Sequence, residues 1–209
     1  MLAVIVFMAF AGAACAGVIS EDVAYWYWNP DGTMSTEFNP STEWLQGHLS
    51  SLVVKVQQTV YDQSLTAAIL SANGDNPVPG GYLYAYSVTN LAWMETMTTG
   101  GIQDFGVAWS VAPALVTIDH SKTDPAWKPI VALTRNGCPF DGVAWQWRPD
   151  TTEPGLLPGG TQGGFWAVAL VGTDTITSAI AADGCDPNSS KWLFGQTTGP
   201  VPEPGGMVT

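Results

Sequence analysis

Apolar or aromatic residues alternate with polar ones along most of this 209-residue chain, and this alternation constrains the fold more than any other feature. Residues two apart on a strand share a face, so a period of two predicts half-buried β-strands. Clusters of Gly, Pro, Asn and Asp separate the alternating segments and predict turns. We expect strands in the segments 23–28, 52–61, 82–89, 103–109, 114–118, 143–148, 165–171 and 175–181.

The spacing of these segments predicts an all-β protein. Short strands joined by turns favour an antiparallel β-sandwich, of jelly-roll or immunoglobulin-like type, with about eight to ten strands and little helix. A closed barrel has the same pattern and stays an alternative. The one helix candidate is Thr42–Leu52, where Trp44, Leu45 and Leu49 have helical spacing, although Gly47 disfavours a helix there.

The chain begins with an apolar leader, MLAVIVFMAFAGAACAG. Ala14-Cys15-Ala16 is a small-x-small pattern that a signal peptidase would cut, which makes Gly17 the first mature residue. The apolar run is shorter than the roughly 20 residues that a membrane-spanning helix needs. Lipoprotein processing, with Cys15 as the acylated first residue, is the alternative. We expect a signal peptide at 1–16, a β-sandwich domain at 17–194, and a flexible spacer rich in Gly, Thr and Pro at 195–209.

Charge and cysteine content narrow the classes of function. The chain has 6 Lys and Arg against 18 Asp and Glu, for a net charge of −12. A protein that binds nucleic acid or an anionic lipid surface needs a basic face, so neither is an expected partner. An exported chain that loses Cys15 keeps Cys138 and Cys185, and an even pair in an oxidising compartment predicts a disulfide. The loop that it closes would hold about 47 residues.

Three segments carry a resemblance to a known family. They are 82–91 (YLYAYSVTNL) with 102–107 (IQDFGV), then 157–165 (LPGGTQGGF), and finally Pro202-Glu203-Pro204 near the C-terminus. Together with the leader, these segments resemble bacterial PEP-CTERM proteins, which are exported and passed to an exosortase-type sorting enzyme.

The resemblance implies a secreted or surface-anchored protein without enzymatic activity. Its implied role is structural or adhesive, in the extracellular polysaccharide matrix of a biofilm, and its implied partners are the exosortase and polysaccharide. In the family, Pro-Glu-Pro is followed by a transmembrane helix and a basic cluster, whereas this sequence ends at Thr209. Membrane retention is therefore expected only of a precursor that carries such an anchor.

Residues that carry catalytic or metal chemistry are few. The two histidines are His48 and His120, and no serine lies in a Gly-x-Ser-x-Gly motif. Oxygen-rich loops at 73–76 and 183–188 have the ligand types of calcium sites, but the same residues are turn formers, and we interpret them as turns. Several carboxylates near tryptophans leave a glycoside hydrolase as a further alternative. We assign no catalytic residue, cofactor or metal ligand.

The ten tryptophans are the most unusual part of the composition. Trp145 and Trp147 share one strand face with apolar neighbours, and the stripe Tyr82, Tyr84 and Tyr86 has the same spacing, so both sets are predicted to be core. Trp26 and Trp28 share a face opposite two tyrosines, so one aromatic pair is either exposed or covered by another element. Exposed aromatic rings stack on sugars, which makes Trp26 and Trp28 the candidate ligand-stacking pair of a carbohydrate-binding module.

Overall fold

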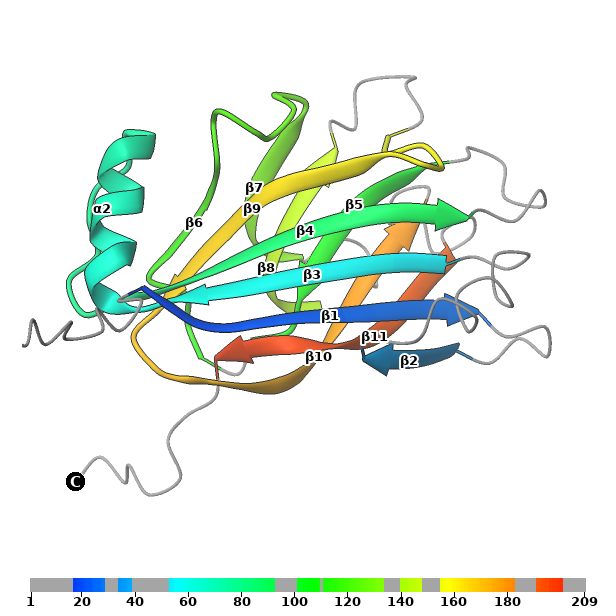
Figure 1. The fold of residues 1–209 in the computed structure, drawn as a ribbon. Coiled ribbons are helices and arrows are strands. Elements are labelled where there is room, and N and C mark those ends of the chain that lie inside the picture. Colours follow the sequence, from blue (N-terminus) through cyan, green and yellow to red (C-terminus); the bar gives the residue numbers. More distant parts are fainter. Residues whose placement is uncertain are drawn as a thin grey trace, which may run out of the picture.

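The computed structural model describes residues 17–28, 34–38, 53–92, 101–109, 111–133, 140–147, 155–182 and 191–200. In this part of the chain two antiparallel sheets pack face to face, which confirms the predicted all-β sandwich (Figure 1). The six-stranded sheet has the order β2 (Met34–Phe38), β1 (Val18–Trp28), β3 (Val53–Tyr61), β4 (Tyr82–Ala92), β9 (Thr161–Ala169), β6 (Leu115–Ile118). The five-stranded sheet has the order β11 (Lys191–Pro200), β10 (Thr173–Ala182), β5 (Ile102–Val107), β8 (Phe140–Trp147), β7 (Trp127–Leu133).

Many neighbouring strands are not consecutive in the sequence. The chain passes from one sheet to the other between β4 and β5, β5 and β6, β6 and β7, β8 and β9, and β9 and β10. As a result β4 pairs with β9, whose residues lie about seventy to ninety positions later, for example Tyr82 opposite Ala169 and Thr89 opposite Thr161. These long-range pairings build the central part of the six-stranded sheet.

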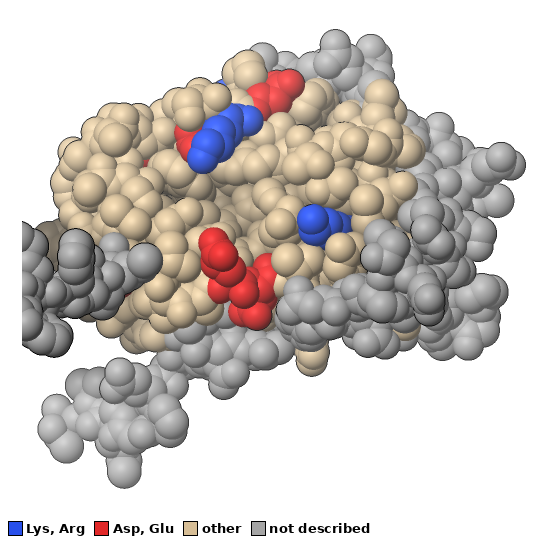
Figure 2. All heavy atoms as spheres, viewed as in Figure 1, with Lys and Arg blue, Asp and Glu red and all other residues tan. Residues whose placement is uncertain are grey.

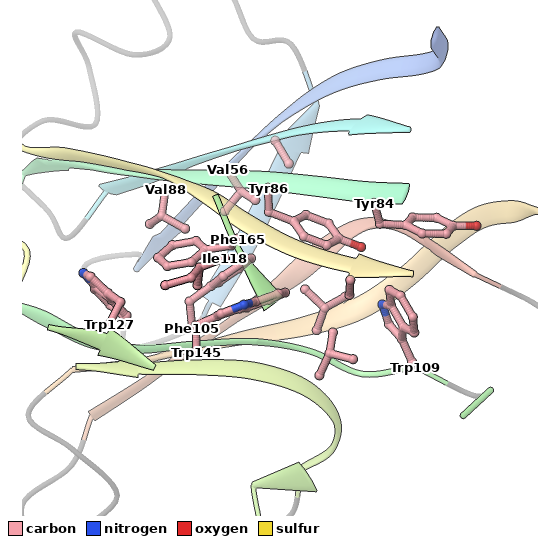
Figure 3. Close-up of a cluster of buried hydrophobic side chains, with 14 of the residues drawn as sticks. Val56, Tyr84, Tyr86, Val88, Phe105, Trp109, Ile118, Trp127, Trp145 and Phe165 are labelled. Atoms are coloured by element: carbon pink, nitrogen blue, oxygen red, sulfur yellow. The ribbon is translucent and has the colours of Figure 1, made fainter. Parts of the chain in front are cut away.

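An aromatic cluster fills the space between the sheets (Figure 3). Phe105 lies at its centre and stacks on Trp145, with ring centroids 5.6 Å apart and an interplanar angle of 15°. Phe165 and Tyr86 contact both rings. The predicted core positions Tyr84, Tyr86 and Trp145 are buried, and Trp147 and Tyr82 pack against the same cluster, so the expectation from strand spacing is confirmed.

A helix, α2 (Gln63–Asn73), interrupts the β pattern where none was expected. Asp62 caps its start, because Oδ1 accepts hydrogen bonds from the backbone of Ser64 and Leu65 at 2.9 Å each. Gly74 ends the helix with a φ of 88°, the left-handed conformation typical of a glycine after the last turn. The predicted helix Thr42–Leu52 lies outside the described residues.

The C-terminal strand corrects the predicted spacer. Residues 195–200 form the second half of β11 and pair with β10 as far as Pro200, opposite Thr173. Thr197 is fully buried and its hydroxyl bonds to Gln58 of the facing sheet. Its Gly/Thr/Pro composition would leave the segment unstructured alone, but the hydrogen-bond ladder to β10 and the cover of the facing sheet stabilise it as a strand. Residues 201–209 lie outside the described part.

Candidate functional site

A groove of about 810 Å³ lies on the outer face of the six-stranded sheet, next to α2. Its floor follows the strand register. Thr59 of β3, Ala85 of β4 and Trp166 of β9 are directly opposite one another and form one row, and Gln57 and Ser87 form the next. Since the side chains that β4 places on this face, Ala85 and Ser87, are smaller than their neighbours on β3 and β9, the middle of this face is low. Figure 2 shows this face with uncharged surface between widely spaced charged side chains.

One wall of the groove is the loop 119–123, which sits on a bulge in β9. The β4–β9 register shifts between Tyr86 and Val88, at the level of Gly163 and Gly164. Gly164 has a φ of +82°, and a Cβ there would come within 2.2 Å of Thr123 Oγ1. The backbone N–H of Asp119 donates to Gly164 O at 2.8 Å, and Thr123 Oγ1 donates to the same carbonyl at 3.1 Å. The glycine therefore allows the loop to approach the sheet closely.

A second wall is α2, and Asn73 at its last position is hydrogen-bonded to the loop wall. Asn73 Nδ2 donates to Ile118 O at 2.8 Å, and Asn73 Oδ1 accepts from the backbone N–H of His120 at 3.0 Å. The same amide donates to Asp75 at 2.6 Å, and Asp75 also accepts from Thr117 Oγ1 at 3.2 Å. These contacts hold the helix end and the loop at a set separation. They also support the interpretation of 73–76 as a turn.

The charged groups of the groove lie on the loop wall. Asp119 is buried and accepts from the N–H and the hydroxyl of Ser121 at 2.9 and 2.6 Å, and its second oxygen is 3.3 Å from Lys122 Nζ. Burial alone would raise the pKa of Asp119, but the hydrogen bonds and Lys122 outweigh it, so the pKa lies below its usual value. The side chain of Lys122 is 72% exposed, and His120 is exposed as well.

The two ends of the groove differ in polarity. Tyr61, Ile69 and Ala72 border the end next to α2, where they are apolar except for the tyrosine hydroxyl. At the other end Gln57 and Ser87 present an amide and a hydroxyl. The groove therefore suits a ligand that has both apolar faces and many hydrogen-bonding groups.

The residues predicted from sequence fall in several places. Trp26 is fully buried. Its ring centroid lies 6.4 Å from that of Phe105, and its Nε1 donates to Gln196 O at 3.1 Å. The prediction that Trp26 is exposed for sugar stacking is therefore wrong, because the facing sheet, including β11, covers that side of β1. The side chain of Trp28 lies outside the described residues, as do Cys138, Cys185, Pro202, Glu203 and Pro204. His120 follows β6, as expected, and lines the groove.

Sequence reasoning missed the groove itself. Its floor combines β3, β4 and β9, and Trp166 was not distinguished from the other tryptophans. The pair Gly163-Gly164 inside an alternating segment was the available signal, because glycine within a strand often marks a bulge or a close approach of another backbone.

No protein-family model, curated protein sequence or solved structure matches this chain. The fold and the groove therefore define its class: an antiparallel β-sandwich with an open groove across one sheet face. Among the described residues no helix is long and apolar enough to cross a membrane.

Proposed function

We propose that this chain is an exported, non-enzymatic β-sandwich protein that binds polysaccharide in the groove described above. Its role would be structural or adhesive, in the extracellular polysaccharide matrix at a bacterial cell surface. The observation that carries the proposal is the groove floor, where the small side chain of Ala85 lies between Thr59 and Trp166 in one row across three strands, and Trp166 is 8% exposed.

The chemistry of sugars fits this surface. A pyranose ring has an apolar face of C–H groups and a rim of hydroxyls, so it needs an apolar floor beside donors and acceptors. Tyr61 and Trp166 supply the apolar part, and Gln57, Thr59 and Ser87 supply the hydrogen bonds. The volume of about 810 Å³ lies within the usual range of ligand sites and has room for several sugar units.

The lining supports binding rather than hydrolysis. A glycoside hydrolase uses two carboxyl groups on either side of the bond that it cleaves. Among the described residues that line the groove, Asp119 is the one carboxylate, and Ser121 and Lys122 already occupy its oxygens. Among the described residues no group of three or more His, Cys, Asp or Glu is placed to hold a metal ion.

The location at the cell surface comes from the resemblance to PEP-CTERM proteins and from the apolar leader. The exosortase would act on a precursor with an anchor, and polysaccharide would be the lasting partner. Gly17 is the residue that signal-peptide cleavage would expose, and its carbonyl accepts a hydrogen bond from the backbone N–H of Asp62 at 2.7 Å. Processing before Gly17 would leave this contact intact.

A groove-filling substitution tests the proposal. We expect Ser87→Trp to abolish binding of the purified protein to insoluble and soluble polysaccharides, because the indole would occupy the low centre of the floor. Thr89→Trp is the matched control, since Thr89 is on the same strand and the same face but does not line the groove. Binding is measured by pull-down and by affinity electrophoresis. Equal binding by wild type and Ser87→Trp, or none by wild type across the panel, would contradict the proposal.

A further inference from the structure

We infer that the groove selects acidic polysaccharide, that is, chains of sugars that carry carboxylate groups, and that Lys122 and His120 bind the acidic group. This inference rests on the proposed function and adds the ligand class. It follows from how charge is distributed within the groove, which differs from the distribution over the chain as a whole.

In the groove the positively charged Lys122 is exposed to solvent, whereas the negatively charged Asp119 is buried. Lys122 and Asp119 form an ion pair, but the lysine side chain is 72% exposed and the aspartate side chain 7%. Asp119 already accepts two hydrogen bonds from Ser121, whereas an ammonium group has three donors. A ligand that enters the groove therefore meets free donors of Lys122 beside the exposed ring of His120.

Two other aspartates close to the loop 119–123, Asp75 and Asp124, also accept hydrogen bonds. The Asp75 carboxylate accepts from Asn73 and Thr117, and the Asp124 carboxylate accepts from the backbone N–H of Ala126 at 2.8 Å. Neither aspartate lines the groove. The net charge of the chain is −12, but among the described residues that line the groove the one carboxylate is buried, so an anionic ligand meets little repulsion there.

The loop that carries His120 and Lys122 is held in place before a ligand binds. The loop bonds are internal, with Lys122 N and Thr123 N donating to Asp119 O at 3.1 and 2.8 Å, and the His120 N–H is bound by Asn73. Little backbone freedom is then lost on binding, which favours affinity. The orientation of the ligand follows from the polarity of the groove, with sugar C–H faces toward Tyr61 and the carboxylate toward Lys122.

The test compares two polymers with the same sugar backbone, one with ionised carboxylates and one with neutral methyl esters. Oligosaccharides of polygalacturonate are titrated calorimetrically into the full protein beside the same oligosaccharides with methyl-esterified carboxyl groups. We expect the acidic form to bind about fivefold more tightly, as for one partly exposed charge-assisted contact. Lys122→Met should remove this preference and Lys122→Arg should keep it. Lys128→Met, which removes an exposed lysine outside the groove, should leave it unchanged.

The outcomes separate this inference from the proposed function. Equal affinity for both polymers, or a preference that survives Lys122→Met, would overturn the acidic selectivity while the groove remained a polysaccharide site. Failure of wild type to bind either polymer, together with failure across the neutral polysaccharides tested with Ser87→Trp, would reject both.

Discussion

Alanine substitutions at three glycines separate the cost of backbone strain from the cost of lost space. Gly159 and Gly164 both have a φ of +82°, a conformation that costs a residue with a side chain about 1–2 kcal/mol. A Cβ at Gly159 meets nothing within 4 Å, so Gly159→Ala should cost only that amount. A Cβ at Gly163 lies 3.5 Å from Ser87, an ordinary contact without positive φ, so Gly163→Ala should be nearly neutral.

Gly164→Ala combines both costs. Its Cβ would lie 2.2 Å from Thr123 Oγ1 and 2.8 Å from Asp119 Cβ, and overpacking of this kind adds about 1–3 kcal/mol. The total loss in unfolding free energy is then about 2–5 kcal/mol, measured by urea denaturation with the slope of each transition compared. The displaced loop should also weaken polysaccharide binding. If Gly164→Ala lowers the unfolding free energy no more than Gly159→Ala does, the close contact between the loop 119–123 and the β9 bulge does not contribute to stability. The loop would then not be a pre-formed wall of the groove.

Three further substitutions test the core and the loop. Phe105→Ala should lower the unfolding free energy by about 3–5 kcal/mol in urea, because its ring contacts aromatic residues from both sheets, and a loss below about 1 kcal/mol would contradict its central position. Trp145→Phe should cost about 1–3 kcal/mol, because Thr117 O loses a buried donor at 2.8 Å; an unchanged denaturation midpoint would argue against that bond. Asp119→Asn should flatten the acid dependence of thermal stability. The pKa of Asp119 is lower in the folded protein than in the unfolded chain. The stability that its ionised form contributes is therefore complete above about pH 4 and is lost as the pH falls through the folded-state pKa. Identical melting profiles of the two proteins between about pH 2 and 7 would contradict this role.

The fold class was predictable because its signal is local. Alternation within segments such as 82–89 and 143–148 matched β4 and β8, and their inward residues Tyr84, Tyr86 and Trp145 are in the core. Helix α2 was missed because its apolar residues form only a narrow stripe, although Asp62 and Gly74, which cap it, stand at both ends of the segment. Capping residues were here a better guide than periodicity.

The candidate site was less predictable. Strand 23–28 has aromatic residues on both faces, so its pattern alone leaves the exposed side undetermined. The pairing of β1 between β2 and β3, and the facing sheet with β11, place Trp26 inside. Composition likewise suggested a free spacer at 195–200, where pairing with β10 makes a strand.

By itself the sequence determined that this chain forms β-strands with turns between them, because side-chain alternation and turn chemistry act between residues close together in the chain. Only the tertiary structure decided which tryptophans are buried and where the groove lies. Trp166, Ala85 and Thr59 form one row because three strands, up to about a hundred residues apart, pair in a particular register. That register depends on how the two sheets pack as a whole, because a slip by one residue would turn every side chain of a strand to the opposite face.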